Sequence, residues 1–238
     1  MKRASVTWGK GIFPGNGLLP SMATGIWTRL TWSRALLAVL VLNLVWTASL
    51  FLAPLTVAPD SFYDETRGGA NVLDFAAVWE TFPLYGRLVY TFGDVQCHQL
   101  AYRSFELNGN QLPIDARMTS MYVFANLGLV AAVFAKPAST TGEVILNGLP
   151  SSLRRALARI GAARAGGVVV FVGLLPIAVD GFTQLLTPYE STNLTRVLTG
   201  APGGFVGGLL VGAMLVSVRQ LVLEIEAFRA RLESAARP

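Results

Sequence analysis

The sequence predicts an all-α, polytopic membrane protein with about four transmembrane helices and an extracytoplasmic interfacial helix. Of its 238 residues, 53% are hydrophobic and only 14% are charged, whereas ordinary soluble domains carry about 25% charged residues. Four stretches are long enough to cross a hydrocarbon core of about 30 Å at about 1.5 Å per residue. The positions of the charges along the chain predict on which side of the membrane each connection lies.

The predicted spans divide the chain into one membrane domain and two tails. A cytoplasmic segment, residues 1–34, precedes this domain, and a cytoplasmic tail, residues 224–238, follows it. None of the polar tracts is long enough to fold as a second domain. The membrane domain, residues 35–223, has spans at about 35–58, 119–135, 166–186 and 200–223 and an outer segment at 59–118.

The basic residues gather on one side of the predicted spans. They precede the first span, lie between the second and third, and follow the fourth, whereas residues 59–118 carry four arginines against eight acidic residues. By the positive-inside rule, both termini lie in the cytoplasm and the segments 59–118 and 187–199 lie outside the cell. The net charge of +5 therefore indicates a multi-pass protein of the plasma membrane and no nucleic-acid partner.

The outer segment predicts an interfacial helix followed by a small hairpin. From residue 71 to about 90, apolar residues alternate with charges, and Glu80, Arg87 and Asp94 lie seven apart on one polar stripe. Pro83 weakens the continuity of this helix. The pair Gly109-Asn110 then predicts a turn, with the hairpin around it.

The fourth predicted span has a glycine at every fourth position. Such a stripe of small residues lets a second helix approach closely inside a membrane. The packing partner is either another helix of the same chain or another chain, in a homo-oligomer or a complex with a different membrane protein. The stripe consists of Gly200, Gly204, Gly208 and Gly212.

The chain has one cysteine and one histidine, and these two residues are adjacent. Cys97 is a soft nucleophile and His98 titrates near neutral pH, so His98 is a candidate general acid or base. Asp115 could join the pair in a metal site, although a zinc site needs three or four ligands and adjacent residues rarely supply them. No cofactor motif is present in the sequence, and the cofactor question stays open.

An acidic residue, Asp180, lies within the third predicted span, about six residues from its outer end. An isolated carboxylate at that depth costs several kcal/mol unless it is paired, hydrated or protonated. Pro176, four residues earlier, is expected to bend the helix. Two interpretations remain open, a polar cavity or a structural ion pair, and both require Arg117 or Arg196 as the partner.

The predicted topology brings these polar residues to the same outer face of the bundle. Guanidinium groups beside a bilayer suit phosphate and carboxylate head groups, because they offer bidentate donors. The candidate catalytic residues are His98 and Asp180. The candidate ligand-binding residues are Arg103, Arg117, Gln184, Asn193 and Arg196.

Two blocks of the sequence resemble DUF2085, a family of small integral membrane proteins from bacteria and archaea. The first block begins with Cys97-His98-Gln99-Leu100, and the second runs from Pro176 through Asp180-Gly181-Phe182-Thr183-Gln184 to Thr199-Gly200. The resemblance covers residues 90–210 and implies a membrane fold without an established reaction. Members of the family usually have Cys-x-Arg-Cys-Thr-Gly where this chain has residues 115–120, Asp-Ala-Arg-Met-Thr-Ser. A site rich in thiolates is therefore excluded here, which leaves only Cys97, His98 and Asp115.

The leading functional hypothesis is an integral membrane protein with a polar site at its extracytoplasmic face. Such a site would bind or process a lipid-linked or small anionic ligand, and whether it catalyses a reaction stays open. The alternative is a non-catalytic accessory subunit of a larger membrane complex, which would dock through the glycine stripe and the aromatic interfacial segment 71–90. A transporter ranks third, because four helices without a repeat are few for a complete pathway. Membrane lipids are partners in each case.

Overall fold

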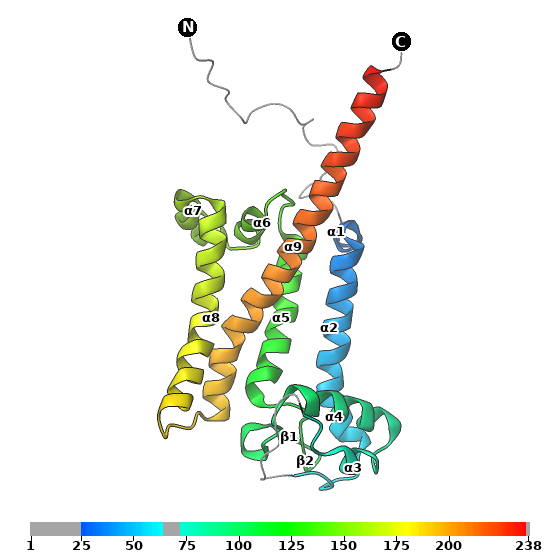
Figure 1. The fold of residues 1–238 in the computed structure, drawn as a ribbon, viewed down its shortest axis with the longest axis vertical. Helices are drawn as coiled ribbons and strands as arrows, with labels where there is room; N and C mark the ends of the chain where they lie inside the picture. The colour runs from blue at the N-terminus through cyan, green and yellow to red at the C-terminus, as the bar shows by residue number, and fades with distance from the viewer. Residues whose placement is uncertain (1–24, 64–71, 237–238) are drawn as a thin grey trace.

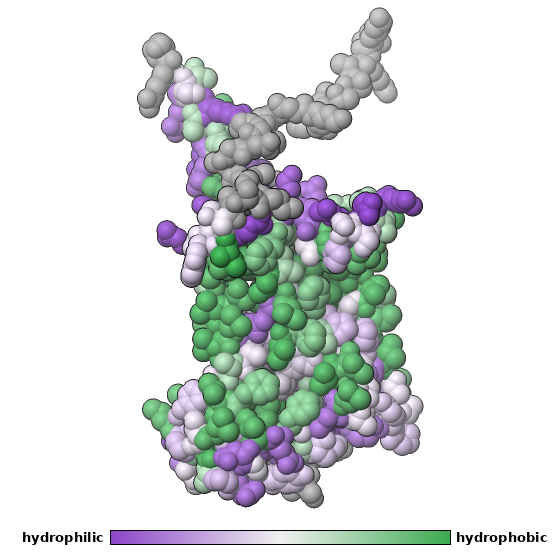
Figure 2. Space-filling model, turned by 180° about the vertical axis from the view of Figure 1, so that it is seen from behind, coloured by the Kyte–Doolittle hydropathy of each residue, from purple (hydrophilic) through white to green (hydrophobic). Residues whose placement is uncertain are grey.

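Four long helices form the body of the molecule (Figure 1). In the computed structural model, which describes residues 25–63 and 72–236, they are α2 (Arg34–Leu52), α5 (Ala116–Phe134), α8 (Ala162–Leu186) and α9 (Asn193–Ala235). All four are long and apolar enough to cross a membrane, and side chains on their surface form an apolar belt between two hydrophilic ends (Figure 2). The predicted all-α membrane fold with four spans is confirmed.

Short elements cover the two ends of this bundle. One end carries what we name the hairpin cap, the described part of residues 53–115. Its elements are η1 (Ala53–Thr56), α3 (Ala76–Trp79), α4 (Leu84–Gln96), η2 (Ala101–Arg103), β1 (Glu106–Leu107) and β2 (Asn110–Gln111). The opposite end carries α1 (Ile26–Trp32), α6 (Thr141–Asn147), α7 (Ser151–Leu157) and η3 (Ala158–Ile160).

The glycine stripe of α9 is covered by α5. A Cβ atom added at Gly204 would lie 2.3 Å from the carbonyl oxygen of Met121, and one at Gly208 would lie 2.1 Å from that of Ala125. Only hydrogen side chains permit this approach of two backbones. The stripe therefore has a partner helix within the same chain, one of the two alternatives that the sequence left open.

The predicted interfacial helix is divided into two helices. Its first residue, Asn71, lies outside the described residues; α3 ends at Trp79, and α4 begins directly after Pro83. The predicted polar stripe is wrong at Asp94, which is fully buried and accepts hydrogen bonds from the indole nitrogen of Trp79 (2.8 Å) and the backbone nitrogen of Phe75 (3.0 Å). These two donors offset the cost of removing the carboxylate from water.

The predicted hairpin is present and is fixed to the end of the first span. Its turn is centred on Asn108 (φ 58°) and Gly109 (φ 70°), one residue earlier than expected, in the left-handed conformation that two-residue hairpin turns use. The Asn110 side chain accepts hydrogen bonds from the backbone nitrogens of Ser61 and Phe62, both at 2.9 Å. The hairpin is thereby held against the segment that follows the first span.

Candidate functional site

The predicted arginines meet at the end of the bundle that carries the hairpin cap. They come from η2, α5 and α9, and they are joined by side chains of α8 and of the connection between α8 and α9. Hydrogen bonds and ion pairs link the whole group, which we name the arginine cluster. Its members are Arg103, Arg117, Asp180, Gln184, Glu190, Ser191 and Arg196.

Asp180 is the buried acceptor of this cluster. Its side chain is 5% exposed and pairs with the guanidinium of Arg117. Gln184, one turn later on the same helix, donates a hydrogen bond from Nε2 to the same carboxylate at 3.2 Å. The ion-pair partner of Asp180 is therefore Arg117, one of the two arginines that the sequence offered.

Arg196 is the most deeply buried cation, with a side chain 2% exposed. Its Nε donates to the hydroxyl of Ser191 (3.1 Å), and its Nη2 donates to Gln184 Oε1 (3.3 Å) and pairs with Glu190. Glu190 also accepts from Arg103 Nη2 at 2.9 Å. One carboxylate thus bridges two arginines from different parts of the chain.

The cluster has more positive than negative charge. Three arginines face two carboxylates, Asp180 and Glu190, so one guanidinium charge is left without a counter-charge inside the group. Nε of Arg103, Nε of Arg117 and Nη1 of Arg196 are buried and have no hydrogen-bond partner in the part of the chain that the structure describes. Buried donors normally have acceptors, so these three nitrogens are exceptions within the cluster.

Helix starts place two of the three arginines. Asp115 accepts a hydrogen bond from the backbone nitrogen of Met118 (2.7 Å) and so caps α5, which puts Arg117 in the first turn of that helix. Thr192 caps α9 in the same way through Thr195 (3.2 Å), and Arg196 follows in its first turn. Both arginines therefore lie where each helix meets the hairpin cap.

The Cys97–His98 pair is split between the interior and the surface of the hairpin cap. Cys97 is 3% exposed, and its sulfur accepts a hydrogen bond from the backbone nitrogen of Asp115 at 3.3 Å. Burial raises the pKa of this thiol to about 12, and the negative charge of Asp115 adds to the effect. The thiol is therefore protonated at neutral pH and is a poor nucleophile, whereas His98 is exposed.

The metal hypothesis gains no support from this geometry. Among the described residues, the structure contains no group of three histidine, cysteine or acidic side chains placed to hold a metal ion. The carboxylate of Asp115 is engaged in capping α5, and the sulfur of Cys97 points into the interior.

Asn193 lies beside the cluster and not within its hydrogen-bond chain. Its side-chain amide donates to the carbonyl oxygen of Ser104 at 3.1 Å and ties the start of α9 to the hairpin cap. Two members of the cluster, Glu190 and Ser191, were absent from the predicted site. The signal available for them was the polar connection that follows the third span, where Glu190 is the one acidic residue.

Comparison with known proteins finds a family match over the stretch that contains the cluster. The family model DUF2085, described as a predicted membrane protein, matches residues 97–210. The chain is similar to this family over just under half of its length. All seven residues of the arginine cluster fall within the matched stretch, and the resemblance stated from the sequence is confirmed.

Two archaeal proteins are similar to this chain. "Uncharacterized protein MJ1492" of Methanocaldococcus jannaschii is 27% identical over 169 residues, which cover 71% of this chain and 85% of the relative. An "Uncharacterized protein" of Methanothermobacter thermautotrophicus is 29% identical over 129 residues, 54% of this chain and 92% of the relative. No solved structure matches the chain.

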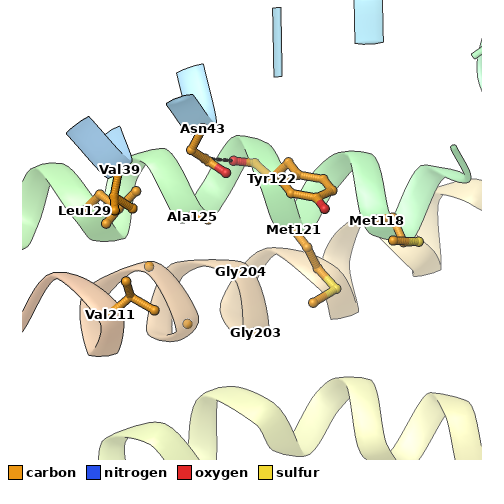
Figure 3. A pocket seen from close by; sticks show the side chains of 12 residues that line it. Val39, Asn43, Met118, Met121, Tyr122, Ala125, Leu129, Gly203, Gly204 and Val211 are labelled. Atoms are coloured by element: carbon orange, nitrogen blue, oxygen red, sulfur yellow. Dashed lines mark hydrogen bonds between the residues drawn. The ribbon is translucent and has the colours of Figure 1, made fainter. Parts of the chain in front are cut away.

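An apolar groove of about 310 Å³ is lined mostly by residues of the matched stretch 97–210. It runs between α2, α5 and α9 (Figure 3). Met118, Met121, Gly203 and Gly207 form part of the lining, and the amide of Asn43 donates to the carbonyl oxygen of Tyr122 at 3.1 Å. The walls are otherwise almost entirely apolar.

Helix periodicity aligns the groove with the arginine cluster. On α5, Arg117 lies one turn before the lining residue Met121, and on α9, Arg196 lies seven residues before Gly203. Residues four or seven apart share one face of a helix. The groove extends along α5 from Met118 to Leu129, eleven residues or about 16 Å of helix. Its Met118 end is one residue from Arg117 in the sequence, and no member of the arginine cluster lines it.

Proposed function

We propose that this protein binds an amphiphile with an anionic head group, which would contact the arginine cluster while its apolar chain occupies the groove. The observation that carries the proposal is the uncompensated guanidinium charge of the cluster at the end of an apolar groove. The proposal concerns binding first, and any chemistry on the ligand would follow from it.

The charge of the arginine cluster and its hydrogen-bond donors support an anionic head group. A phosphate or carboxylate accepts two parallel bonds from a guanidinium, and such charge-assisted bonds are stronger than neutral ones. The electrostatic attraction is largest where water is partly excluded, as it is around Arg117 and Arg196, whose side chains are 21% and 2% exposed. An anion here would satisfy donors that the protein leaves unmatched.

The apolar lining of the groove supports a hydrocarbon chain in the ligand. Its lining is formed within the segments that are long and apolar enough to cross the membrane, so its natural occupant is hydrocarbon. A small soluble anion would use the arginines alone and would leave the adjacent groove unexplained. The two features together favour a ligand that has both parts.

The site also admits a catalytic role, which we propose as a second step. Asp180 accepts hydrogen bonds from Arg117 and Gln184. Its carboxylate would balance the positive charge of His98 when that residue is protonated. His98, exposed on the hairpin cap, is the candidate proton donor or acceptor. Under this proposal His98→Ala removes turnover of a bound lipid but leaves its affinity unchanged.

Lipid titration of the purified full-length chain tests the binding proposal. In a neutral detergent, native mass spectrometry compares phosphatidylglycerol, which is anionic, with phosphatidylcholine, which has no net charge. We expect phosphatidylglycerol to bind at least tenfold more tightly. Arg103→Gln, which makes the cluster neutral, should weaken that binding about tenfold, and Glu190→Gln, which raises its charge to +2, should strengthen it. Equal affinity for the two lipids, or no response to either variant, would contradict the proposal.

The side of the membrane that bears the site is also a proposal, based on the distribution of charge. The hairpin cap would face outwards, with both termini in the cytoplasm. A cysteine introduced at the exposed Tyr102 should react with a membrane-impermeant maleimide in intact cells. A cysteine at Ala230, near the end of α9, should react only after lysis. The reverse pattern would invert the topology.

A further inference from the structure

The last part of α9 projects beyond the rest of the bundle (Figure 1). The helix has 43 residues, about 64 Å at 1.5 Å per residue, which is roughly twice the thickness of a hydrocarbon core. Between Gly212 and Ala235 the sequence contains neither glycine nor proline. The projecting part is therefore a straight continuation of the membrane helix, without a residue at which it would bend onto the membrane surface.

A row of large apolar side chains runs along one face of this helix and remains exposed. Successive members are separated by alternating steps of three and four residues, the spacing of a coiled-coil seam. Each is between 44% and 60% exposed. We name this row the α9 seam: Val211, Met214, Val218, Leu221, Ile225, Phe228 and Leu232.

The C-terminal half of the seam lies in a polar part of the sequence. From Arg219 onwards charged residues recur along α9, yet Ile225, Phe228 and Leu232 stay exposed among them. Contiguous apolar surface in water marks a contact with another molecule, and a lone projecting helix gains most of its stability from packing of its apolar face. We therefore expect the seam to pack against a partner helix whose apolar residues follow the same three- and four-residue spacing.

We propose that the partner is a second copy of this chain, and that two α9 helices pack as a parallel two-stranded coiled coil along the α9 seam. In heptad terms, the a positions are Val211, Val218, Ile225 and Leu232, and the d positions are Met214, Leu221 and Phe228. β-Branched residues at a with leucine at d favour two parallel strands over higher oligomers. Three of the four a positions are β-branched.

Membrane insertion supports the parallel arrangement. Two copies that enter one membrane with the same topology are related by a two-fold axis along the membrane normal, so their α9 helices run in the same direction and each seam residue meets its own equivalent. The flanking charges agree with this register. Glu224 at a g position faces Arg229 at the following e position of the other copy, an attractive pair.

Glu224 already has partners within its own chain. It accepts hydrogen bonds from Ser139 (2.6 Å) and Gln220 (2.9 Å), which place it at the edge of the seam that faces the connection between α5 and α6. The contact with Arg229 of a second copy is thus a peripheral one, and the apolar residues carry the association. This proposal does not rest on the lipid-binding proposal, because the cluster lies at the opposite end of α9 and, of the seam residues, Val211 alone also lines the groove.

Oxidative cross-linking in native membranes tests the seam. Phe228→Cys places a thiol at a d position, whereas Ala230→Cys, two residues later, places one on the opposite face of the same exposed turn. Cys97 is buried and is present in both variants as a constant background. We expect Phe228→Cys to form a disulfide-linked dimer on mild oxidation and Ala230→Cys to stay monomeric. Equal cross-linking of the two variants, or none in either, would overturn the proposal.

The oligomeric state gives an independent measurement. Native mass spectrometry of the full-length chain from lipid nanodiscs should show a dimer. Ile225→Asp, which puts a charge into the seam, should raise the dimer dissociation constant at least tenfold, whereas Ala230→Asp adds the same charge to the opposite face and should leave it unchanged. A monomeric wild-type chain, or equal effects of the two aspartates, would overturn the proposal.

Discussion

Two buried aspartates show how the same side chain serves different purposes in this protein. Asp94 in the hairpin cap and Asp180 in α8 are 0% and 6% exposed. Asp94 accepts from two neutral donors, the Trp79 indole and a backbone nitrogen, within an aromatic cluster. Asp180 accepts from Arg117 and belongs to a network with an excess cation at the end of a groove. Burial of a carboxylate alone does not indicate a ligand site; the proposed site differs from the surroundings of Asp94 in the charge balance of its residues.

The largest change in the free energy of unfolding is expected when Asp180 is removed from its ion pair with Arg117 and the arginine is kept. Removing one member of a buried ion pair costs about 3–5 kcal/mol because the other charge is left without a partner. Arg117 is 21% exposed, so water compensates part of this, and we expect Asp180→Leu to lower the free energy of unfolding by about 3 kcal/mol. Reversible denaturation in mixed micelles measures the change.

The matched double variant separates stability from binding at this site. Arg117→Met together with Asp180→Leu replaces the pair by apolar groups of similar size, which is often neutral for stability. Most of the lost stability should return, while selectivity for phosphatidylglycerol over phosphatidylcholine should not. A double variant that keeps this selectivity would show that Arg117 does not contact the head group.

A smaller effect is expected at Asp94, and it should concern stability only. Asp94→Ala leaves the Trp79 indole and the Phe75 backbone nitrogen buried without an acceptor, which costs about 2 kcal/mol. Asp94→Asn keeps an acceptor oxygen and should cost less. Lipid affinity should be unchanged in both variants, and a loss of lipid selectivity would contradict the structural role assigned to Asp94.

The smallest effect is a loss of stability at alkaline pH that arises from Cys97 in the interior of the hairpin cap. Burial raises the pKa of Cys97 from 9.0 to about 12, so the folded protein keeps this proton at pH values where the unfolded chain releases it. The stabilisation that comes from this retained proton is complete below about pH 9 and is lost as the pH rises towards 12. The free energy of unfolding falls over this range by up to about 1.4 kcal/mol per pH unit for one group.

Burial raises the pKa of the Tyr90 phenol as well, and the same reasoning applies at higher pH. Denaturation midpoints between pH 8 and pH 11 should therefore fall in the wild-type protein and fall less steeply in Cys97→Ala. Rapid reaction of folded Cys97 with a maleimide at pH 7 would contradict its assignment as a buried, protonated thiol.

The sequence predicted those features that depend on composition and on short-range periodicity. The apolar length of the spans specified the four helices, and Asp180 within the third of them required a cationic partner that could be narrowed to two arginines. The hairpin followed from its glycine-containing turn, with an error of one residue. The split of the interfacial helix at Pro83 was anticipated only as a weak point in its continuity.

Other features could not be predicted because they depend on which helix faces which. The charged stripe placed Asp94 on the surface, whereas packing against Trp79 and Phe75 turns it inwards. Glu190 has an ordinary loop sequence around it, and its role arises because η2 and α9 bring two arginines to the same point. The seven-residue spacing of the α9 seam is visible in the sequence, but its exposure is a property of the folded bundle.

The amino-acid order by itself determined a four-span helical protein whose acidic residue in the third span needs an arginine, since hydrophobic length and the cost of a lone charge in hydrocarbon are local properties. Only the folded arrangement decided that α5 covers the glycine stripe of α9, because close backbone contact requires two surfaces of matching shape. It also decided that three arginines share two carboxylates beside an apolar groove, since this charge balance depends on residues from η2, α5, α8 and α9 meeting in space.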